Sequence, residues 1–586
     1  MASTILSFRK IFRLIFILFS LYLMGDAFYR WDGFRYYASF PEFLPGLALT
    51  IILWSVVAVF MSLLVWLSAR LLEWFCPYVG WKIRAEHFLL FLFALALLGV
   101  TIWIGRHRIW DIVHTQRKIL FLSLILISIL ITWLFRNKVE QWMRIVQERI
   151  TPLVWLFGIL VLLSVPLVTY HTWVKQAVKA VSPPTPQHTA SDRKRLNIIL
   201  VTFDTLSAQN MSLYGYYRPT TPFITEWANK ASVFTRLEAA SNWTPPAAAS
   251  LMTGKRPWTH RVYHMNSRIV KGKTENLPLA LKNNGYYNMA FIVNPLASVK
   301  TLGIADSFEV APLYSEFGSP ASLFGWVEKS LSQLFAGKIL MYDWIIKGDF
   351  ILRRVIDMIS RNFSKTIVPP ERAFNRFLLN FNDNLPEPFF IWIHVFPPHH
   401  PYLPVEPFMG MFDSSPELRT LKSQWKLPLN LSYKDEMQQT VDILRDRYDE
   451  FIRYCDKQFE DFITRLTTGD NLKNTLIILS SDHGETFERN FLGHTGPHLY
   501  EPLTNIPLII REPGQNKGIV IDELAEQIDI PPTILELADI PAPSWMEGHS
   551  LVPLMRGKRL PSHPVFSMTF GGNPSRGERI SKGTIA

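Results

Sequence analysis

The N-terminal third of the chain is dominated by apolar segments that contain no Asp, Glu, Lys or Arg. Five such runs lie at Leu14–Gly25, Phe43–Ser68, His87–Gly105, Ile119–Phe135 and Ile150–Val174. A helix needs about 20 mostly apolar residues to cross the ~30 Å hydrocarbon core of a bilayer. The second to fifth runs meet or approach that length, and the first reaches it with the residues up to Trp31. We therefore expect a domain of five transmembrane helices in residues 1–178.

The first run has a second interpretation, because a short apolar segment after basic residues is also typical of a signal peptide. Arg9, Lys10 and Arg13 precede it. A cleavage site of small residues does not follow, and further apolar runs come after it. These two features favour a membrane anchor.

The basic residues of the short loops predict the orientation. With the N-terminus in the cytoplasm, the inner segments carry ten Lys and Arg residues and the outer loops carry six. Loops rich in Lys and Arg stay on the cytoplasmic side. Five crossings then make everything after about residue 175 extracytoplasmic, at the outer face of the plasma or inner membrane. The net charge is +11, and we attribute the basic excess in these loops to topology and to contact with lipid headgroups. Nucleic acid is not an expected partner, because the soluble part has no basic stripe.

The rest of the chain reads as a folded α/β domain. An aromatic content of 13% with only 19% charged residues excludes intrinsic disorder, and two cysteines exclude a disulfide scaffold. Residues 179–196 form a Pro-rich polar linker. Beyond it, apolar strand-like runs alternate with helical segments, a pattern typical of a mostly parallel central sheet. The expected strands are Leu196–Phe203, Tyr287–Val293, Pro388–Phe396, Asn474–Ser480 and Ile506–Arg511.

Polar residues follow three of these expected strands. Asp204 follows the first, His399 and His400 follow the third, and Asp482-His483 follows the fourth. Ligands of open α/β sheets bind beyond the carboxyl ends of the strands. An Asp at such a position is often only a helix cap, but adjacent Asp and His side chains offer an oxygen and a nitrogen to one divalent ion.

Several motifs resemble the sulfatase-like domains of the alkaline phosphatase superfamily. They span residues 196–560 and, in chain order, begin with the strand ending at Asp204 and the Thr244-Pro-Pro-Ala-Ala-Ala-Ser segment that leads to Gly254-Lys255-Arg256-Pro257. The later motifs are Pro398-His399-His400-Pro401-Tyr402, Ser481-Asp-His-Gly-Glu485, Asp529-Ile-Pro-Pro-Thr533 and Gly548-His-Ser-Leu551. The resemblance implies a sulfatase-like α/β fold for residues 197–586. Because the chain ends as it enters a new segment at Ser581–Ala586, we expect this domain to be C-terminally incomplete.

The departures from the family pattern concern the nucleophile. Sulfatases carry a Cys or Ser that is oxidised to formylglycine, and here Thr244 occupies that position with Ala248 in place of the motif's Arg. Thr cannot form that aldehyde, so no formylglycine is expected. The chain instead resembles Thr-nucleophile members such as phosphoethanolamine transferases and lipoteichoic-acid synthases, which also join five membrane helices to an extracytoplasmic catalytic domain. The resemblance implies that Asp204, Thr244, Asp482 and His483 bind one divalent ion (Zn, Mn, Ca or Mg), although those two families carry Glu where this chain has Asp204.

The resemblance also implies a mechanism. A divalent ion can activate a Thr hydroxyl to attack a phosphodiester, after which the phosphoryl group passes to an alcohol or to water. Cationic groups or N–H donors should surround the charge that develops. The expected substrate-binding residues are His399, His494, Lys255 and His260. His400 and His498 are neighbouring alternatives to the first two, and a solvated helix end is the alternative for the last two.

We therefore expect an enzyme that transfers or hydrolyses the headgroup of a membrane phospholipid, or another anionic ester, through Thr244. One alternative is a hydrolase of sulfate esters or phosphodiesters unrelated to lipids. An alternative of another class is a non-catalytic lipid or glycan sensor. The presence of all four expected metal-site residues favours the enzyme.

Overall fold

The computed structural model describes residues 7–34, 39–79, 84–105, 117–174, 195–312 and 368–570 with short internal gaps, parts of 317–339, and 583–585. The chain divides into two compact units, one of Met1–Tyr29 with Phe40–Lys179 and one of Arg30–Ser39 with Ala180–Ala586. Most of the expected linker at 179–196 lies outside the described residues.

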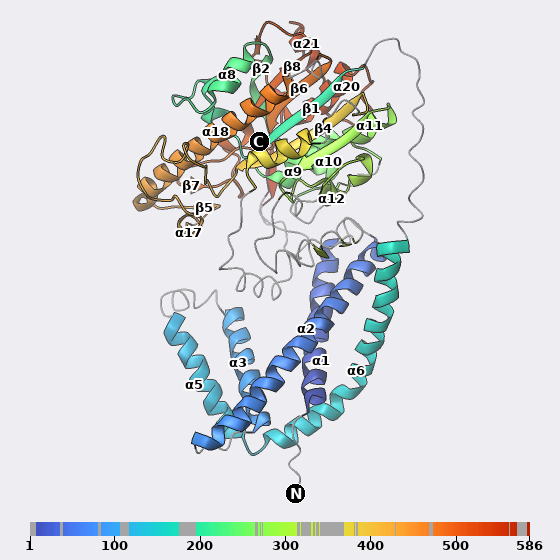
Figure 1. The fold of residues 1–586 in the computed structure, drawn as a ribbon, viewed down its shortest axis with the longest axis vertical. Helices are drawn as coiled ribbons and strands as arrows, with labels where there is room; N and C mark the ends of the chain where they lie inside the picture. Colours follow the sequence, from blue (N-terminus) through green and yellow to red (C-terminus); the bar gives the residue numbers. More distant parts are fainter. Residues whose placement is uncertain are drawn as a thin grey trace. The chain divides into compact units, whose positions relative to one another are not determined.

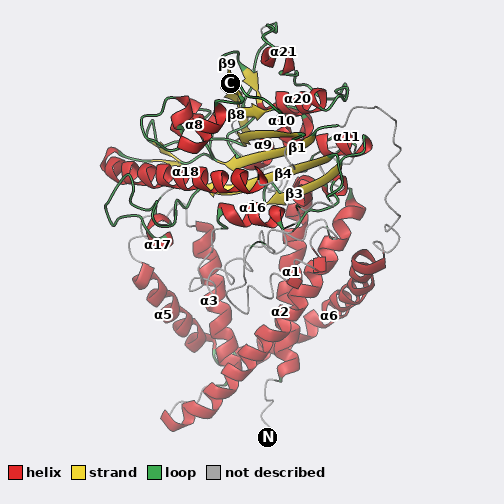
Figure 2. Cartoon of the chain, turned by 45° about the horizontal axis from the view of Figure 1, so that its top comes forward, coloured by secondary structure: helices red, strands yellow, loops and turns green. Residues whose placement is uncertain are grey.

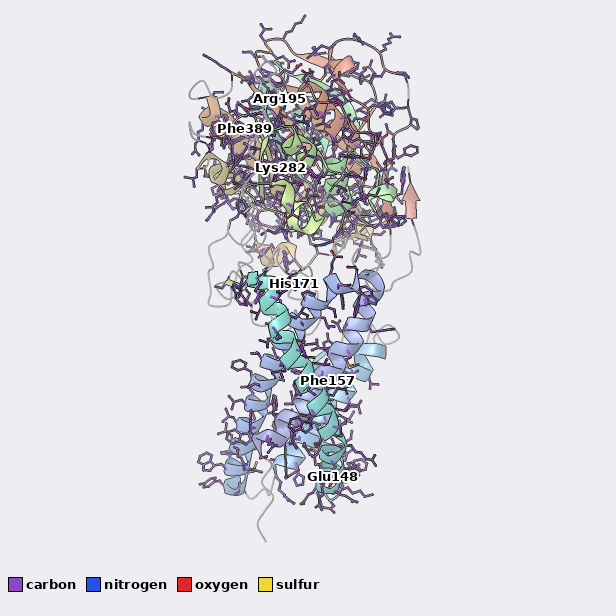
Figure 3. The ribbon with its side chains drawn as sticks, turned by 90° about the vertical axis from the view of Figure 1, so that its right-hand side faces the viewer. Glu148, Phe157, His171, Arg195, Lys282 and Phe389 are labelled. Atoms are coloured by element: carbon purple, nitrogen blue, oxygen red, sulfur yellow. The ribbon has the colours of Figure 1, made fainter. Side chains whose placement is uncertain are left out.

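The N-terminal unit is helical (Figure 1). Its helices are α1 (Phe8–Phe34), α2 (Phe40–Phe75), α3 (Ala85–Gly105), α5 (Arg117–Phe135) and α6 (Val139–Thr169), which continues into a π-helical turn at Tyr170–Val174. Figure 3 shows α6 from the side, with Glu148, Phe157 and His171 spaced along it. Phe157 is buried against Phe16 and Ala58, whereas Leu162 is 71% exposed. Such an outward apolar surface is suited to lipid rather than to water.

Four of these helices are long and apolar enough to cross a bilayer: Phe8–Phe28, Phe40–Tyr78, Ala85–Ile102 and Val139–Val174. The fifth, α5, has a shorter described apolar stretch at Phe121–Phe135. At 1.5 Å per residue that stretch is about 22 Å long, less than the ~30 Å hydrocarbon core. The expectation of apolar spanning helices is therefore supported for four segments, and five crossings remain a prediction.

The C-terminal unit is built on a mixed, mostly parallel sheet in the order β10-β2-β8-β6-β1-β4-β3, with β9 paired to β2. The central strand β1 is parallel to both of its neighbours, β4 and β6, and β8 is antiparallel to β6 and β2. The strand bounds are Asn197–Asp204 (β1), Ser232–Glu238 (β2), Tyr287–Ile292 (β3), Phe389–Pro398 (β4), Thr475–Ser481 (β6), Asn505–Arg511 (β8), Ile519–Ile521 (β9) and Ala525–Glu526 (β10). The expected α/β class is confirmed.

Helices cover both faces of this sheet (Figure 2). Alternate side chains of β1 enter two different cores: Ile199 packs with residues of α8 (Pro222–Ala228), α16 (Pro370–Leu378) and α18 (Gln438–Thr467). Leu200 packs with residues of α9 (Thr244–Thr253), α11 (Leu277–Asn283) and α20 (Ile530–Leu537). Burial of each such aliphatic side chain contributes about 1.5–3 kcal/mol. Because β1 is buried on both faces, its end is held rigidly.

Short elements complete the C-terminal unit. Two small antiparallel sheets pair β5 (Leu431–Ser432) with β7 (Phe491–Leu492), and β11 (Met568–Phe570) with β12 (Gly583–Ile585). The short helices are α10 (Pro257–His260), α12 (Val299–Leu302), α17 (Leu421–Gln424), α19 (Glu501–Thr504) and α21 (Val552–Met555).

Candidate active site

Thr244 is the first residue of α9 and is only 3% exposed. Pro245 and Pro246 occupy the first turn, where backbone N–H groups have no partner within the helix and proline is tolerated. Gly254 ends the helix with a φ of +64°, a conformation that glycine adopts without strain. The positive end of the α9 dipole provides a favourable environment for an anion next to the Thr244 hydroxyl.

Two buried carboxylates lie at the ends of adjacent parallel strands, Asp204 on β1 and Asp482 directly after β6. Asp482 Oδ1 accepts hydrogen bonds from the backbone N–H groups of His483 (2.8 Å) and Thr205 (3.2 Å). Thr205 has a φ of +64°, which is rare for a β-branched residue. Asp482 Oδ2 and Asp204 Oδ1 have no hydrogen-bond partner among the described residues. Buried carboxylate oxygens of this kind require a positive partner.

His483 connects the two carboxylates to Thr244. Its Nε2 lies 3.6 Å from Asp204 Oδ1, 3.6 Å from Asp482 Oδ2 and 3.3 Å from Thr244 Oγ1. Its Nδ1 donates to the Gly484 carbonyl (2.9 Å), so the neutral ring has its lone pair on Nε2. Burial lowers the pKa of His483 to about 3, which keeps the ring neutral. All four expected metal-site residues therefore lie together.

Sequence reasoning missed two residues of this cluster. His394, inside β4, has its Nε2 3.6 Å from Asp204 Oδ2 and 4.0 Å from Asp482 Oδ2, and its Nδ1 lies 2.8 Å from Thr202 Oγ1. Asn294, which follows β3, donates to Asp204 Oδ2 and, at 3.4 Å, to Thr244 Oγ1. The available signal for His394 was a single imidazole within an otherwise apolar strand.

The cluster has the chemistry of a metal site. Ligand atoms of Asp204, His394 and Asp482 all lie within 4.8 Å of one another, and all three residues are buried. His394 Nε2, like the two free carboxylate oxygens, has no hydrogen-bond partner among the described residues. Burial, followed by the charge of Asp204, raises the pKa of Asp482 to about 7. A divalent cation would supply the missing partner for each of these atoms, and a set of Asp and His ligands suits several such ions.

Two further expected residues lie next to His483. The His494 ring centroid is 4.7 Å from that of His483 and 4.9 Å from that of His399. His494 Nδ1 donates to Glu485 Oε1 (3.0 Å), and Tyr402 donates to Glu485 Oε2 (2.8 Å). Burial opposes the charged form of His494, but the Glu485 carboxylate outweighs it and raises the pKa of His494 above its ordinary value. The structure therefore brings His399 and His494 to the cluster, with Glu485 orienting the latter.

The other two expected substrate-binding residues lie elsewhere. Lys255 forms an ion pair with Glu275, and its Nζ lies 5.3 Å from the centroid of the Trp545 ring. His260 is buried, with Nε2 2.9 Å from Ser250 Oγ. Both residues follow the C-terminal end of α9, which at 1.5 Å per residue is about 15 Å from Thr244. Their contacts are those of residues that stabilise the fold around α9.

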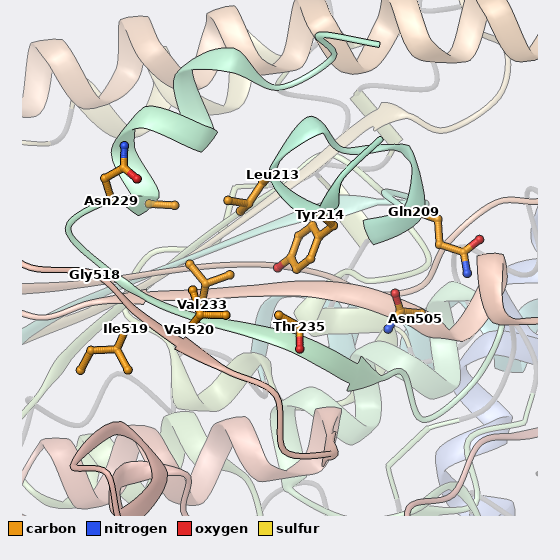
Figure 4. Close-up of a pocket in the computed structure, with 11 residues that line it drawn as sticks. Gln209, Leu213, Tyr214, Asn229, Val233, Thr235, Asn505, Gly518, Ile519 and Val520 are labelled. Atoms are coloured by element: carbon orange, nitrogen blue, oxygen red, sulfur yellow. The ribbon is translucent and has the colours of Figure 1, made fainter. Parts of the chain in front are cut away.

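A separate pocket of about 510 Å³ lies beside β2 and β9 (Figure 4). Its described lining includes Leu213, Tyr214, Val233 and Val520, and it contains no carboxylate, imidazole or thiol. The Tyr214 hydroxyl accepts a hydrogen bond from the backbone N–H of Leu508 (3.1 Å). The described lining of this pocket thus has none of the groups that the Thr244 cluster offers for catalysis.

Comparisons with known proteins identify a family for this chain. The model of the Sulfatase family matches residues 196–540. A sulfatase of Formosa agariphila is 25% identical over 409 residues, which are 64% of this chain and 76% of that protein. The multifunctional alkaline phosphatase superfamily protein PehA of Trinickia caryophylli is 26% identical over 351 residues, 53% of this chain and 66% of that protein. The crystal structure of a phosphonate monoester hydrolase of Agrobacterium radiobacter aligns with a TM-score of 0.46 at 19% identity, over 64% of this chain and 80% of that one.

The family match covers more than half of the chain and includes every residue of the Thr244 cluster. The chain therefore belongs to the sulfatase family and is a sulfatase-like hydrolase of the alkaline phosphatase superfamily.

Proposed function

We propose that this protein is a metal-dependent enzyme that cleaves phosphate esters through a Thr244 nucleophile and passes the phosphoryl group to water or to an alcohol. One observation carries the proposal. The buried Thr244 hydroxyl lies 3.3 Å from His483 Nε2, beside two carboxylates that each have an oxygen without a hydrogen-bond partner. A hydroxyl held in this way is suited to attack.

One divalent ion would be held by Asp204, Asp482, His483 and Thr244, with His394 facing both carboxylates. When bound, the ion supplies positive charge that lowers the pKa of a neighbouring hydroxyl and offsets charge on the phosphoryl oxygens. Asn294 donates to Thr244 Oγ1 and so fixes the direction of its lone pairs. Zn, Mn, Ca and Mg all remain candidates for the ion.

The covalent steps follow from the position of Thr244. The Thr244 O–H bond breaks as Oγ1 forms a bond to phosphorus. The bond from phosphorus to the leaving oxygen breaks, and that oxygen takes up a proton and departs as an alcohol. His399 and His494 can donate to the phosphoryl oxygens as charge develops. Water or a second alcohol then attacks the phosphothreonine and regenerates Thr244.

Phosphate chemistry is favoured over sulfate chemistry by the nucleophile itself. Thr cannot be converted to the formylglycine of sulfatases, and the relative PehA is named a multifunctional protein of the alkaline phosphatase superfamily. Sulfate ester hydrolysis is the second candidate, because other relatives, including that of Formosa agariphila, are named sulfatases. Membership of a family of hydrolases disfavours the sensor.

The substrate class follows from the apolar helices. We propose that residues 1–178 anchor the catalytic domain, residues 197–586, through the linker at 179–196, with the N-terminus in the cytoplasm and the domain outside. A membrane phospholipid headgroup is then the anionic ester at highest local concentration. The anchor is supported by the four long apolar helices and their exposed apolar side chains. The proposed location of the domain outside requires α5 as a fifth crossing.

A substrate panel on the full chain in detergent, with added metal, tests the proposed chemistry. We expect turnover of an aryl phosphodiester above that of the matched aryl sulfate, lost in Thr244→Ala and partly restored in Thr244→Ser. Thr253→Ala makes the same change at the other end of α9 and should retain activity. Equal turnover by Thr244→Ala and wild type would refute the nucleophile, and a preference for the sulfate would favour the second candidate.

A further inference from the structure

We propose a second metal site, which shares no residue with the Thr244 cluster, formed by Asp529, His549 and His563 and suited to Zn²⁺. One potential ligand atom from each residue lies within 4.8 Å of the other two. Two imidazoles and one carboxylate form a donor set that zinc uses with three protein ligands and an open fourth position. These residues come from three separate segments of the chain, so chain proximity alone does not explain their convergence.

Asp529 is the fixed member of the group. It is fully buried at the N-terminal end of α20, where Oδ1 accepts from the backbone N–H of His549 (2.7 Å) and Oδ2 accepts from that of Glu526 (2.8 Å). Each carboxylate oxygen has two lone pairs, so Oδ2 retains one for a further partner. Hydrogen bonds that hold a ligating carboxylate in place are typical of metal sites.

His563 is oriented toward that oxygen. Its Nδ1 lies 3.4 Å from the Pro561 carbonyl and its Nε2 lies 3.8 Å from Asp529 Oδ2. Because a carbonyl only accepts, Nδ1 is the protonated nitrogen of the neutral ring, which leaves the lone pair on Nε2. This Nε2 is buried and has no hydrogen-bond partner among the described residues. A ligating histidine typically donates its other N–H to a carbonyl in this way.

His549 completes the group from the protein surface. Its ring centroid is 4.7 Å from that of His563, and its side chain faces solvent. Ligands at about 2.0–2.1 Å in a tetrahedral zinc site are about 3.3 Å apart. The 3.8 Å distance from His563 Nε2 to Asp529 Oδ2 therefore needs a closure of about half an ångström. The exposed His549 ring can rotate to bring its own nitrogen to the ion, and water can take the fourth position.

The bound ion would stabilise the segment after His563, which pairs with the residues that precede Thr244. Beyond His563, Ser567 Oγ donates to the Ala239 carbonyl and the Met568 N–H donates to the Ala240 carbonyl (2.9 Å). Residues 239 and 240 lead into α9 and Thr244. Zinc at this site should therefore stabilise the fold and hold the segment that supports the start of α9.

Zinc binding is measured on the full chain in detergent, in a background of Asp204→Asn and Asp482→Asn that disables the Thr244 cluster. We expect one equivalent of zinc to remain bound after incubation with zinc chloride and desalting, and none in the same background with His549→Gln or His563→Gln. Zinc should also raise the unfolding temperature of the background protein and leave that of the two Gln variants unchanged. His171→Gln, an imidazole outside both groups, is the matched control and should retain the zinc.

The outcomes separate this site from the proposed function. His549→Gln is the cleaner variant, because its exposed ring contributes little to packing and the metal-free unfolding temperature should not change. No zinc in the background protein, or equal zinc in the background and its Gln variants, would overturn the proposal. A further outcome is that His563→Gln lowers the unfolding temperature by the same amount with and without zinc. That result would show that His563 and Asp529 form an ion pair and not a zinc site, and it would overturn the proposal. None of these results depends on the activity of Thr244.

Discussion

Gly484, between the proposed metal ligand His483 and Glu485, approaches another part of the backbone more closely than a side chain permits. A Cβ at this position would lie 1.9 Å from the carbonyl oxygen of Pro502 and 3.2 Å from Ser207 Cβ. The Gly484 N–H also donates to the Leu503 carbonyl (2.8 Å). The Asp-His-Gly-Glu motif thus needs glycine for this close approach and not for a left-handed turn. Gly484→Ala must move the backbone on which His483 is held.

The size of the effect follows from these contacts. Overpacking of a well-packed interior costs about 1–3 kcal/mol, and a collision with a backbone atom belongs at the upper end of that range. Weakening the hydrogen bond to Leu503 adds about 1 kcal/mol. The free energy of unfolding should therefore fall by about 3–4 kcal/mol. A displacement of His483 by about 1 Å should lower kcat about 100-fold.

Two measurements on the full chain in detergent check this prediction: denaturant unfolding, and turnover of an aryl phosphodiester. Gly158→Ala makes the same substitution in α6, where a Cβ meets no atom within 4 Å, and should change neither quantity appreciably. Wild-type stability and turnover in Gly484→Ala would refute the argument from close approach. If Gly484→Ala lost turnover but kept the wild-type free energy of unfolding, the effect would come from the displacement of His483 alone.

Three further predictions concern neighbouring residues. His394→Gln should weaken metal binding about 10–100-fold, as measured by competition with a chelator, and unchanged affinity would remove His394 from the site. Glu485→Gln should lower kcat more than KM changes, because His494 loses the carboxylate that orients it; an unchanged kcat would contradict that role. Burial and then the charge of Lys255 lower the pKa of His260 to about 3, so its stabilisation is complete above pH 6.5 and declines as the pH falls toward 3. Lowering the pH from 7 to 5 should therefore cost about 2 kcal/mol of unfolding free energy through this residue, and His260→Gln should show a correspondingly shallower pH dependence.

Much of the fold and most residues of the cluster followed from the sequence and its resemblance to a family. Buried parallel strands read as continuous apolar runs, and their carboxyl ends meet at one edge, which is why Asp204 and Asp482 could be expected to lie together. His394 was not predicted, because it lies within such an apolar run. It is close to Asp204 only through the pairing of β1 with β4. Asn294 reaches Asp204 from the end of β3, across the intervening strand β4, a proximity that no local pattern encodes.

Two other expectations depended on distances that a sequence does not reveal. Lys255 and His260 are near Thr244 in the chain, but the ten residues of α9 separate them from it in space. The number of membrane crossings depends on the length of one helix, α5, which falls close to the limit for a span. The side of the membrane on which the catalytic domain lies changes with that number, so labelling of single cysteines placed on either side of α5 would determine it.

The central claim is that Thr244 forms a covalent phosphoryl intermediate. The most direct test is the intact mass of the metal-loaded protein after incubation with phosphatidylethanolamine or with phosphatidylglycerol, each beside Thr244→Ala. We expect the wild type alone to gain the mass of a phosphorylated headgroup, located at Thr244 by peptide mapping, with the added mass identifying the lipid. Turnover of either lipid with no adduct on Thr244 under any quench condition, or the same adduct on Thr244→Ala, would contradict the account.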